Sequence, residues 1–198
     1  MARPRQISDD EILSAARAVF VDDGPAASTS KVADLLGVSQ AALFRRFGSK
    51  ERLLIEALAP PQTPAWVAAL SDGPDHRPLA EQLIEIAETA AVYLREHVPR
   101  LSALTASGVR HEAIFAHYED GPPVLGALRA ITAWFERARR LKLIDEDTDP
   151  QSAAVLFMGA VQFPAFLNHL PIPAKRRPLG PKTLTKTVAL FARGLERQ

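Results

Sequence analysis

Serine and glycine residues divide residues 28–58 into three short helical segments. A serine just before a helix accepts a hydrogen bond from a backbone N–H of the first turn. A glycine just after a helix readily takes the left-handed conformation that ends it. The boundary residues are Ser28, Gly37, Ser39, Gly48 and Ser49. This pattern predicts a short helix between Ser28 and Gly37, a second over about 40–47 and a third over roughly 50–58.

Helical periodicity recurs along the rest of the chain, and no useful stretch alternates with the period of two that a strand requires. A first helix is expected from about Ser8 to Val21, because its apolar residues recur on one helical face. Further helices are expected at 79–97, near 100–107, at 110–119, after Gly121, at about 150–168 and at about 182–196. The predicted fold class is all-α.

The spacing within residues 28–47 is that of a helix-turn-helix. Two closely crossing helices need a small residue at the contact, a glycine in the turn and an apolar anchor in the second helix. Ala33, Gly37 and Leu43 supply them, with Gly37 four residues after Ala33 and Leu43 six further on. Leu43 and Phe47 point inward at i and i+4, which leaves other faces of the second helix for recognition.

The outward residues of that second helix suit a DNA groove. Gln40 has the amide that pairs bidentately with adenine, and Ala41 permits close approach to base edges. Arginine, lysine and serine side chains nearby suit phosphate oxygens. The residues predicted on these grounds to contact DNA are Ser28, Thr29, Ser39, Gln40, Ala41, Arg45, Arg46 and Lys50. The alternative for the two arginines is a merely solvated helix face.

Residues 7–55 resemble the TetR-type transcriptional regulators, through ILSAARAVF, KVADLLGVS, QAALFRRF and GSKERLL. The resemblance implies that the family's DNA-contacting positions are occupied here by Ser28, Gln40, Ala41, Phe44, Arg46 and Lys50. The family usually has tyrosine where this chain has Phe44, so a phosphate-bonding hydroxyl is absent and Arg45 and Arg46 are expected to replace it. No enzymatic activity and no cofactor are expected.

Prolines at 60, 61, 64, 74 and 78 predict a connector over 59–78 that contains one short helix at 65–70. The expected domains are therefore a three-helix helix-turn-helix DNA-binding domain at 1–58, this connector, and a helical effector-binding and dimerisation domain at 79–198. By resemblance, the helices at about 150–168 and 182–196 pair with their copies in a homodimer. The apolar run at 153–167 agrees with this pairing, or else it forms the buried core helix of a monomer.

A small-molecule effector, apolar or aromatic in character, is expected from the family resemblance alone. The candidate pocket residues are Tyr93, Trp134, Phe157, Gln162, Phe163 and Phe166, each at a position expected to be buried. Each of these residues is also compatible with plain core packing.

Composition sets only wide limits on function. The formal net charge is +1 and there is no cysteine, so thiolate metal sites and disulfides are excluded. No signal segment or sufficiently long apolar span is recognised, and a soluble cytoplasmic protein is expected.

The favoured function is a homodimeric repressor that binds a palindromic operator through the helix at 40–47 and is released by an effector. One alternative is a sequence-tolerant architectural DNA-binding protein. Another is a metal-dependent enzyme using His111, Glu112 and His117, although their spacing separates the two imidazoles around a helix.

Overall fold

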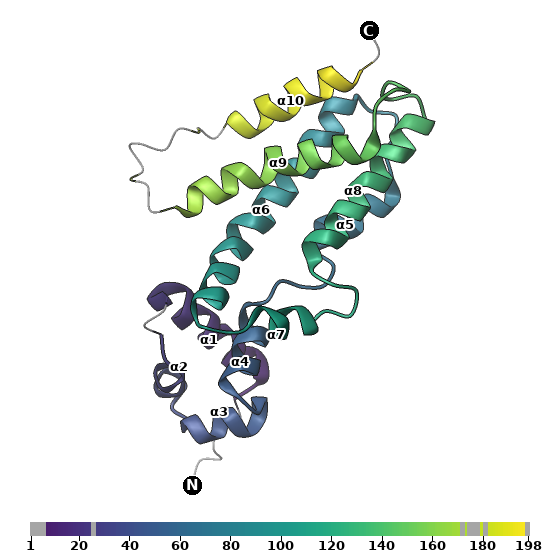
Figure 1. The fold of residues 1–198 in the computed structure, drawn as a ribbon. Helices are drawn as coiled ribbons and strands as arrows, with labels where there is room; N and C mark the ends of the chain where they lie inside the picture. Colours follow the sequence, from purple (N-terminus) through teal and green to yellow (C-terminus); the bar gives the residue numbers. More distant parts are fainter. Residues whose placement is uncertain (1–6, 25–26, 171–172, 174–178, 180–181, 197–198) are drawn as a thin grey trace. The chain divides into compact units, whose positions relative to one another are not determined.

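The computed structural model of the chain describes residues 7–24, 27–170, 173, 179 and 182–196. These residues form helices and connecting segments with no strand among them, which confirms the predicted all-α class (Figure 1). The chain divides into two compact units. Unit 1 contains residues 1–60 and 99–119, and unit 2 contains residues 61–98 and 120–198.

Unit 1 is built from short capped helices. They are α1 (Asp9–Asp23), α2 (Thr29–Leu36), α3 (Gln40–Phe47), α4 (Lys50–Leu58), α7 (His111–Ala116) and the C-terminal end of α6 (Leu79–Ala106). The serine hydroxyls predicted as caps accept hydrogen bonds from backbone N–H groups in the first turns of α2, α3 and α4. The expected boundaries of α3 and α4 are confirmed.

The core of unit 1 lies between the helix-turn-helix and α1. Helix α1 packs against α2 and α4, and α3 packs against the same two helices. The buried side chains from these four helices include Ile12, Ala16, Phe20, Val32, Leu43, Phe47, Leu53 and Leu58. Two of them, Leu43 and Phe47, anchor α3 as the sequence predicts.

Unit 2 contains the longer helices. It is formed by α5 (Ala65–Ala69), the 3-10 helix η2 (Leu70–Asp72), α8 (Pro123–Arg140), α9 (Pro150–His169), α10 (Thr183–Leu195) and the N-terminal end of α6. Helix α9 packs against α8 and α10, and α8 also contacts α5 and η2 (Figure 1). Trp134, Phe135, Phe157 and Phe191 form an aromatic cluster in its core, with ring centroids 5.4–6.2 Å apart.

The expected break between helices at 79–97 and 100–107 is wrong, because α6 runs through Pro99 without interruption. A proline inside a helix costs about 3 kcal/mol through its lost hydrogen bond and steric clash. Burial on both sides offsets that cost: Leu83 and Ala87 lie in the core of unit 2, and Ala103 and Leu104 lie in the core of unit 1.

The compact units differ from the predicted domains in two places. Residues 99–119 belong to unit 1, although the sequence analysis placed them in the C-terminal domain. The expected connector at 59–78 is largely part of unit 2, because Trp66, Val67 and Leu70 are buried in its core. The buried amide of Gln82 also holds residues 75–77 through three hydrogen bonds to their backbone.

Helix α9 has nearly the predicted bounds of about 150–168, but it is less covered than the buried helix expected from the apolar run at 153–167. It has 20 residues, enough to cross a membrane by length and composition alone, yet only 28% of its most apolar window is buried. The core helix of a soluble protein also meets that criterion. Four of its large apolar side chains, Val155, Leu156, Phe163 and Phe166, are therefore exposed in the described chain.

Candidate nucleic-acid interface

The turn between α2 and α3 has the backbone geometry that its glycine predicts. Gly37 lies in the left-handed region at φ 66° and ψ 31°, and its N–H donates to the carbonyl oxygens of Ala33 and Asp34. Val38 N–H donates to the Ala33 oxygen at 3.0 Å, which closes the end of α2. A side chain at position 37 would strain this conformation. The turn thus fixes where α3 begins.

Helix α3 has one buried face and one outward face. Leu43 is 0% exposed and Phe47 is 4% exposed, while Ala41 and Arg45 lie on the surface and Phe44 is half-buried. The packing of two apolar anchors therefore orients the other residues of α3 toward solvent. This arrangement gives the chain one projecting helix whose outward side chains are an amide, a small methyl group, an aromatic ring and a guanidinium.

One of the predicted contact residues is placed differently from the expectation. Thr29 was expected to donate its hydroxyl to a phosphate, but its side chain is buried at 3% exposure. The Thr29 hydroxyl instead accepts a hydrogen bond from the Gln40 amide nitrogen. As the first residue of α2, Thr29 faces the start of α3 rather than the solvent.

The two arginines of α3 have different surroundings. Arg46 pairs with Asp9 at 2.7 Å and also donates to the carbonyl oxygen of Ile7, so it fastens the start of α1 to α3. Arg45 is exposed and has no hydrogen bond or ion pair with any described residue. Sequence reasoning missed the Arg46 contacts because Asp9 and Ile7 lie almost forty residues away, with no local signal linking them.

The remaining predicted residues lie around the ends of the same helices. Ser28 is half-buried and its hydroxyl accepts from the Lys31 N–H at 3.3 Å. Ser39 is exposed and caps α3 through the Ala42 N–H at 3.1 Å. The Lys50 ammonium lies 5.7 Å from the centre of the Phe20 ring, and no carboxylate among the described residues pairs with it.

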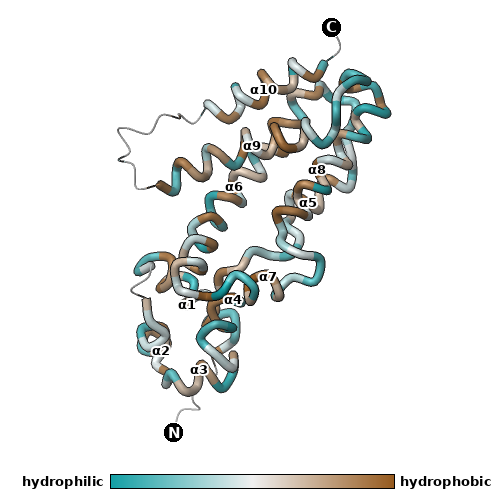
Figure 2. Tube along the Cα trace, in the orientation of Figure 1, coloured by the Kyte–Doolittle hydropathy of each residue, from teal (hydrophilic) through white to brown (hydrophobic). Residues whose placement is uncertain are grey.

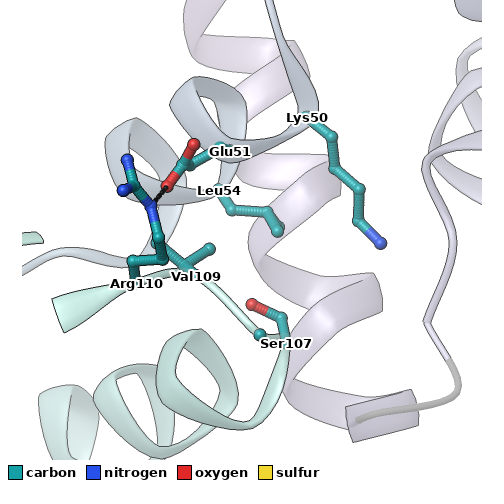
Figure 3. Close-up of a pocket in the computed structure, with 7 residues that line it drawn as sticks. Lys50, Glu51, Leu54, Ser107, Val109 and Arg110 are labelled. Atoms are coloured by element: carbon teal, nitrogen blue, oxygen red, sulfur yellow. Dashed lines mark ion pairs between the residues drawn. The ribbon is translucent and has the colours of Figure 1, made fainter. Parts of the chain in front are cut away.

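An open cavity of about 370 Å³ in unit 1 adjoins Lys50. It is lined by Lys50, Glu51, Leu54, Ser107, Gly108, Val109 and Arg110. Figure 3 shows the Glu51 carboxylate and the Arg110 guanidinium pointing toward one another, with 4.0 Å between the paired atoms. This cavity could not be predicted from the sequence, because its second wall comes from residues 107–110, which were assigned to the other domain.

The six residues predicted to line an effector pocket do not share one environment. Trp134 and Phe157 are fully buried in the aromatic cluster of unit 2, where they serve as core. Phe163 and Phe166, which were expected to be buried, are 58% and 53% exposed on α9. Gln162 is half-buried, and Tyr93 is half-buried and stacks on His97 with 4.1 Å between ring centroids.

The outward face of α9 is apolar. Figure 2 shows hydrophobic residues along much of this helix. Its exposed large side chains are Val155, Leu156, Phe163 and Phe166, and the neighbouring α10 adds the exposed Leu190. Gly159 lies in the same exposed stripe, and no described atom lies within 4 Å of the Cβ that another residue would place there. We refer to Val155, Leu156, Gly159, Phe163 and Phe166 as the α9 face.

His111, Glu112 and His117 do not form a metal-binding group in unit 1. The His111 ring stacks with Phe115 and the His117 ring contacts Tyr118 edge-on. Over the described part of the chain, no three histidine, aspartate or glutamate side chains gather in an arrangement that would hold a metal ion.

The sequence profile described as "Bacterial regulatory proteins, tetR family" matches residues 12–57. This range contains most of α1 and all of α2 and α3. No curated protein sequence matches the chain. The matched family is one of regulatory proteins, in agreement with the expectation of a protein that is not an enzyme.

Solved structures match nearly the whole chain. A putative TetR-family regulator from Mesorhizobium loti is 21% identical with a TM-score of 0.68, over 94% of this chain and 93% of that one. The TetR-family regulator PfmR from Thermus thermophilus is 22% identical with a TM-score of 0.66, over 98% and 100%. A protein described as the flavonoid-responsive regulator FrrA is 22% identical with a TM-score of 0.60, over 96% and 97%. At these identities the likeness concerns the fold. Residues 12–57 therefore match the TetR family of bacterial regulatory proteins, and the chain has an all-α fold similar to that of solved TetR-family regulators.

Proposed function

We propose that the chain is a homodimeric transcriptional repressor that binds a palindromic DNA operator through α3 and acts in the cytoplasm. The observation that carries the proposal is the division of α3 into two faces. Leu43 and Phe47 are buried, so that Gln40, Ala41 and Arg45 project from a rigidly held helix. Recognition helices of helix-turn-helix proteins read base edges with such N-terminal residues while flanking cations meet phosphates.

The charged residues around α3 support different proposed roles in DNA binding. Arg45 and Lys50 have no carboxylate partner among the described residues, so their charges are available to phosphates. Arg46 is already paired with Asp9, and we propose that it supports the orientation of α3 more than it neutralises DNA. Ser28 and Ser39, at the starts of α2 and α3, complete the proposed phosphate contacts.

A second copy of the chain is the proposed partner of the α9 face and of α10. Helix-turn-helix proteins that read palindromic sites act as dimers, whose two-fold symmetry matches the operator. The α9 face leaves apolar side chains exposed, and its Gly159 permits close approach of another helix. Ala153 and Ala154 of the same helix are buried within the chain and do not belong to the α9 face.

We further propose that a small aromatic effector binds in unit 2 and releases the DNA. FrrA is described as flavonoid-responsive, which supports an aromatic ligand for a protein of this fold. Within unit 2, the buried indole N–H of Trp66 has no hydrogen-bond partner among the described residues. A buried donor without an acceptor is costly, and a ligand oxygen would satisfy it.

The DNA proposal is tested by selecting bound sequences from a random duplex pool with the purified full-length chain. We expect a palindrome whose half-sites lie about one helical turn or more apart. Arg45→Ala should weaken binding, whereas Arg140→Ala, which removes an exposed arginine from α8 in unit 2, should not. Enrichment of no sequence, with affinity that collapses as salt rises, would instead favour the architectural alternative. Absence of DNA binding would refute both.

The effector proposal is tested by fluorescence, since the chain has only two tryptophans, Trp66 and Trp134. Both are buried in unit 2. A flavonoid panel titrated into the protein should change this emission and lower the affinity for the selected operator. Trp66→Phe should abolish or weaken the effect of the flavonoid on operator affinity. Operator binding that no aromatic probe alters would contradict the aromatic character of the effector.

A further inference from the structure

We propose that Thr29 is a positioning residue for sequence reading: its buried hydroxyl holds the Gln40 amide in the orientation that meets a base edge. This inference rests on the proposed DNA-binding function. It changes the role of Thr29 from a phosphate contact to an internal support. It also assigns base selectivity at one operator position to a pair of residues rather than to Gln40 alone.

The two residues meet across the turn of the helix-turn-helix. Thr29 is the first residue of α2 and Gln40 is the first residue of α3, eleven positions later in the chain. The Gln40 amide nitrogen donates to the Thr29 hydroxyl oxygen. Thr29 is 3% exposed, while Gln40 lies on the surface. The contact therefore joins a buried acceptor to an exposed side chain.

Burial decides which of the two residues faces the ligand. Within the described ranges only Thr29 and Gln82 are buried polar or charged side chains, and Gln82 has three backbone partners of its own. A threonine hydroxyl at this exposure cannot reach DNA. Gln40 can contact a base, because one amide N–H and the amide oxygen remain free after the contact with Thr29.

The benefit of such a contact is entropic and directional. A long glutamine side chain loses rotamer freedom when it binds, and prior restraint by a neighbour lowers that loss. Adenine recognition needs one donor and one acceptor presented together in a fixed plane. A single hydrogen bond to Thr29 restricts that plane before DNA arrives. The restraint should therefore affect discrimination between bases more than overall affinity.

The test uses the full chain and compares three substitutions by selection from a random duplex pool. Gln40→Ala first identifies the operator position at which base preference is lost. Thr29→Val removes the hydroxyl and retains the shape, and it should reduce preference at that same position about fivefold or more, since one bidentate pair discriminates about 5- to 150-fold. Thr29→Ser retains the hydroxyl and should restore the preference. In Thr29→Val with Gln40→Ala, no further loss is expected.

A second measurement needs no DNA and guards against misfolded variants. In the wild-type protein the Gln40 side-chain amide should show a higher NMR order parameter than the amide of Gln151, an exposed glutamine on α9. Equal mobility of the two amides would overturn the proposal, as would unchanged base preference in Thr29→Val. A wild-type protein that selects no sequence would refute the proposed DNA-binding function itself. The wild-type selection is therefore carried out before any variant is compared.

Discussion

Replacing Phe163 and Phe166 with glutamate should dissociate the proposed dimer. The rings are 58% and 53% exposed on the α9 face. About half of each ring's area of roughly 200 Å² is therefore available for burial against a second copy. At ~25 cal/mol per Å² this is about 2.5 kcal/mol per ring. Two rings on each of two protomers contribute about 10 kcal/mol before the costs of association are subtracted.

That magnitude is comparable to the free energy of a dimer with a dissociation constant between micromolar and nanomolar, about 8–12 kcal/mol. The double substitution removes this contribution and places four carboxylates in an apolar interface, which carries a further desolvation cost. We expect the dissociation constant to rise at least a hundredfold. Sedimentation velocity across a range of protein concentrations measures it directly.

A matched control is available in the same chain. Phe115 in unit 1 is 53% exposed, close to the exposure of Phe166, but it lies on α7. Phe115→Glu changes the same residue type at equal exposure and should leave the oligomeric state unchanged. The reasoning is refuted if the double variant retains the wild-type dissociation constant, or if the wild-type protein is a monomer. Recovery of the wild-type chain with membranes would identify a lipid environment as the partner of α9 instead.

Other consequences concern stability and charge. Leu43→Ala should lower the free energy of unfolding by about 2–5 kcal/mol, because Leu43 is 0% exposed. Leu35→Ala, at a residue that is 65% exposed, should change it little. Chemical denaturation measures both values. Gln82→Leu removes three hydrogen bonds to backbone and should cost about 3 kcal/mol in the same assay. Burial raises the pKa of Tyr118 to about 12. Its neutral form is therefore favoured in the folded protein. The stability that this preference contributes should be intact below about pH 10, the pKa in the unfolded chain, and should be lost as the pH rises toward 12. Tyr118→Phe should abolish this loss of stability at high pH. Arg45→Ala should reduce the magnitude of the negative slope of log affinity against log salt concentration by about 0.9. Fluorescence anisotropy with duplex DNA measures this slope. An unchanged slope would show that Arg45 contacts no phosphate.

The elements that local signals control were predictable from the sequence. The serine caps and the glycine at position 37 determined α2, α3 and α4 closely, because capping and positive φ act within a few residues. The inward direction of Leu43 and Phe47 followed from helical spacing alone. The predicted outward character of Gln40, Ala41 and Arg45 follows from the same spacing and agrees with their exposure.

The parts that the sequence did not reveal depend on contacts between distant residues. Separate helices were expected at 79–97 and near 100–107, because the burial that sustains α6 on both sides of Pro99 is tertiary. Thr29 was expected on the surface because its hydrogen bond crosses a turn to another helix. The exposure of Phe163 and Phe166 could not be distinguished from burial, since an apolar helix has the same composition in a core and at an interface between copies.

The helix-turn-helix unit is discontinuous along the chain, which limits how it can be exchanged between proteins. Unit 1 includes residues 99–119, and Leu104, Ile114 and Tyr118 share its buried core with α1 and α4. The Tyr118 hydroxyl donates to the Pro60 carbonyl at 2.9 Å, which joins the two pieces where α4 ends. A fragment that stops near residue 60 would expose this core to water. A chimera that grafts a new DNA specificity onto another regulator must therefore transplant two separate segments, or redesign the surface that the second one covers.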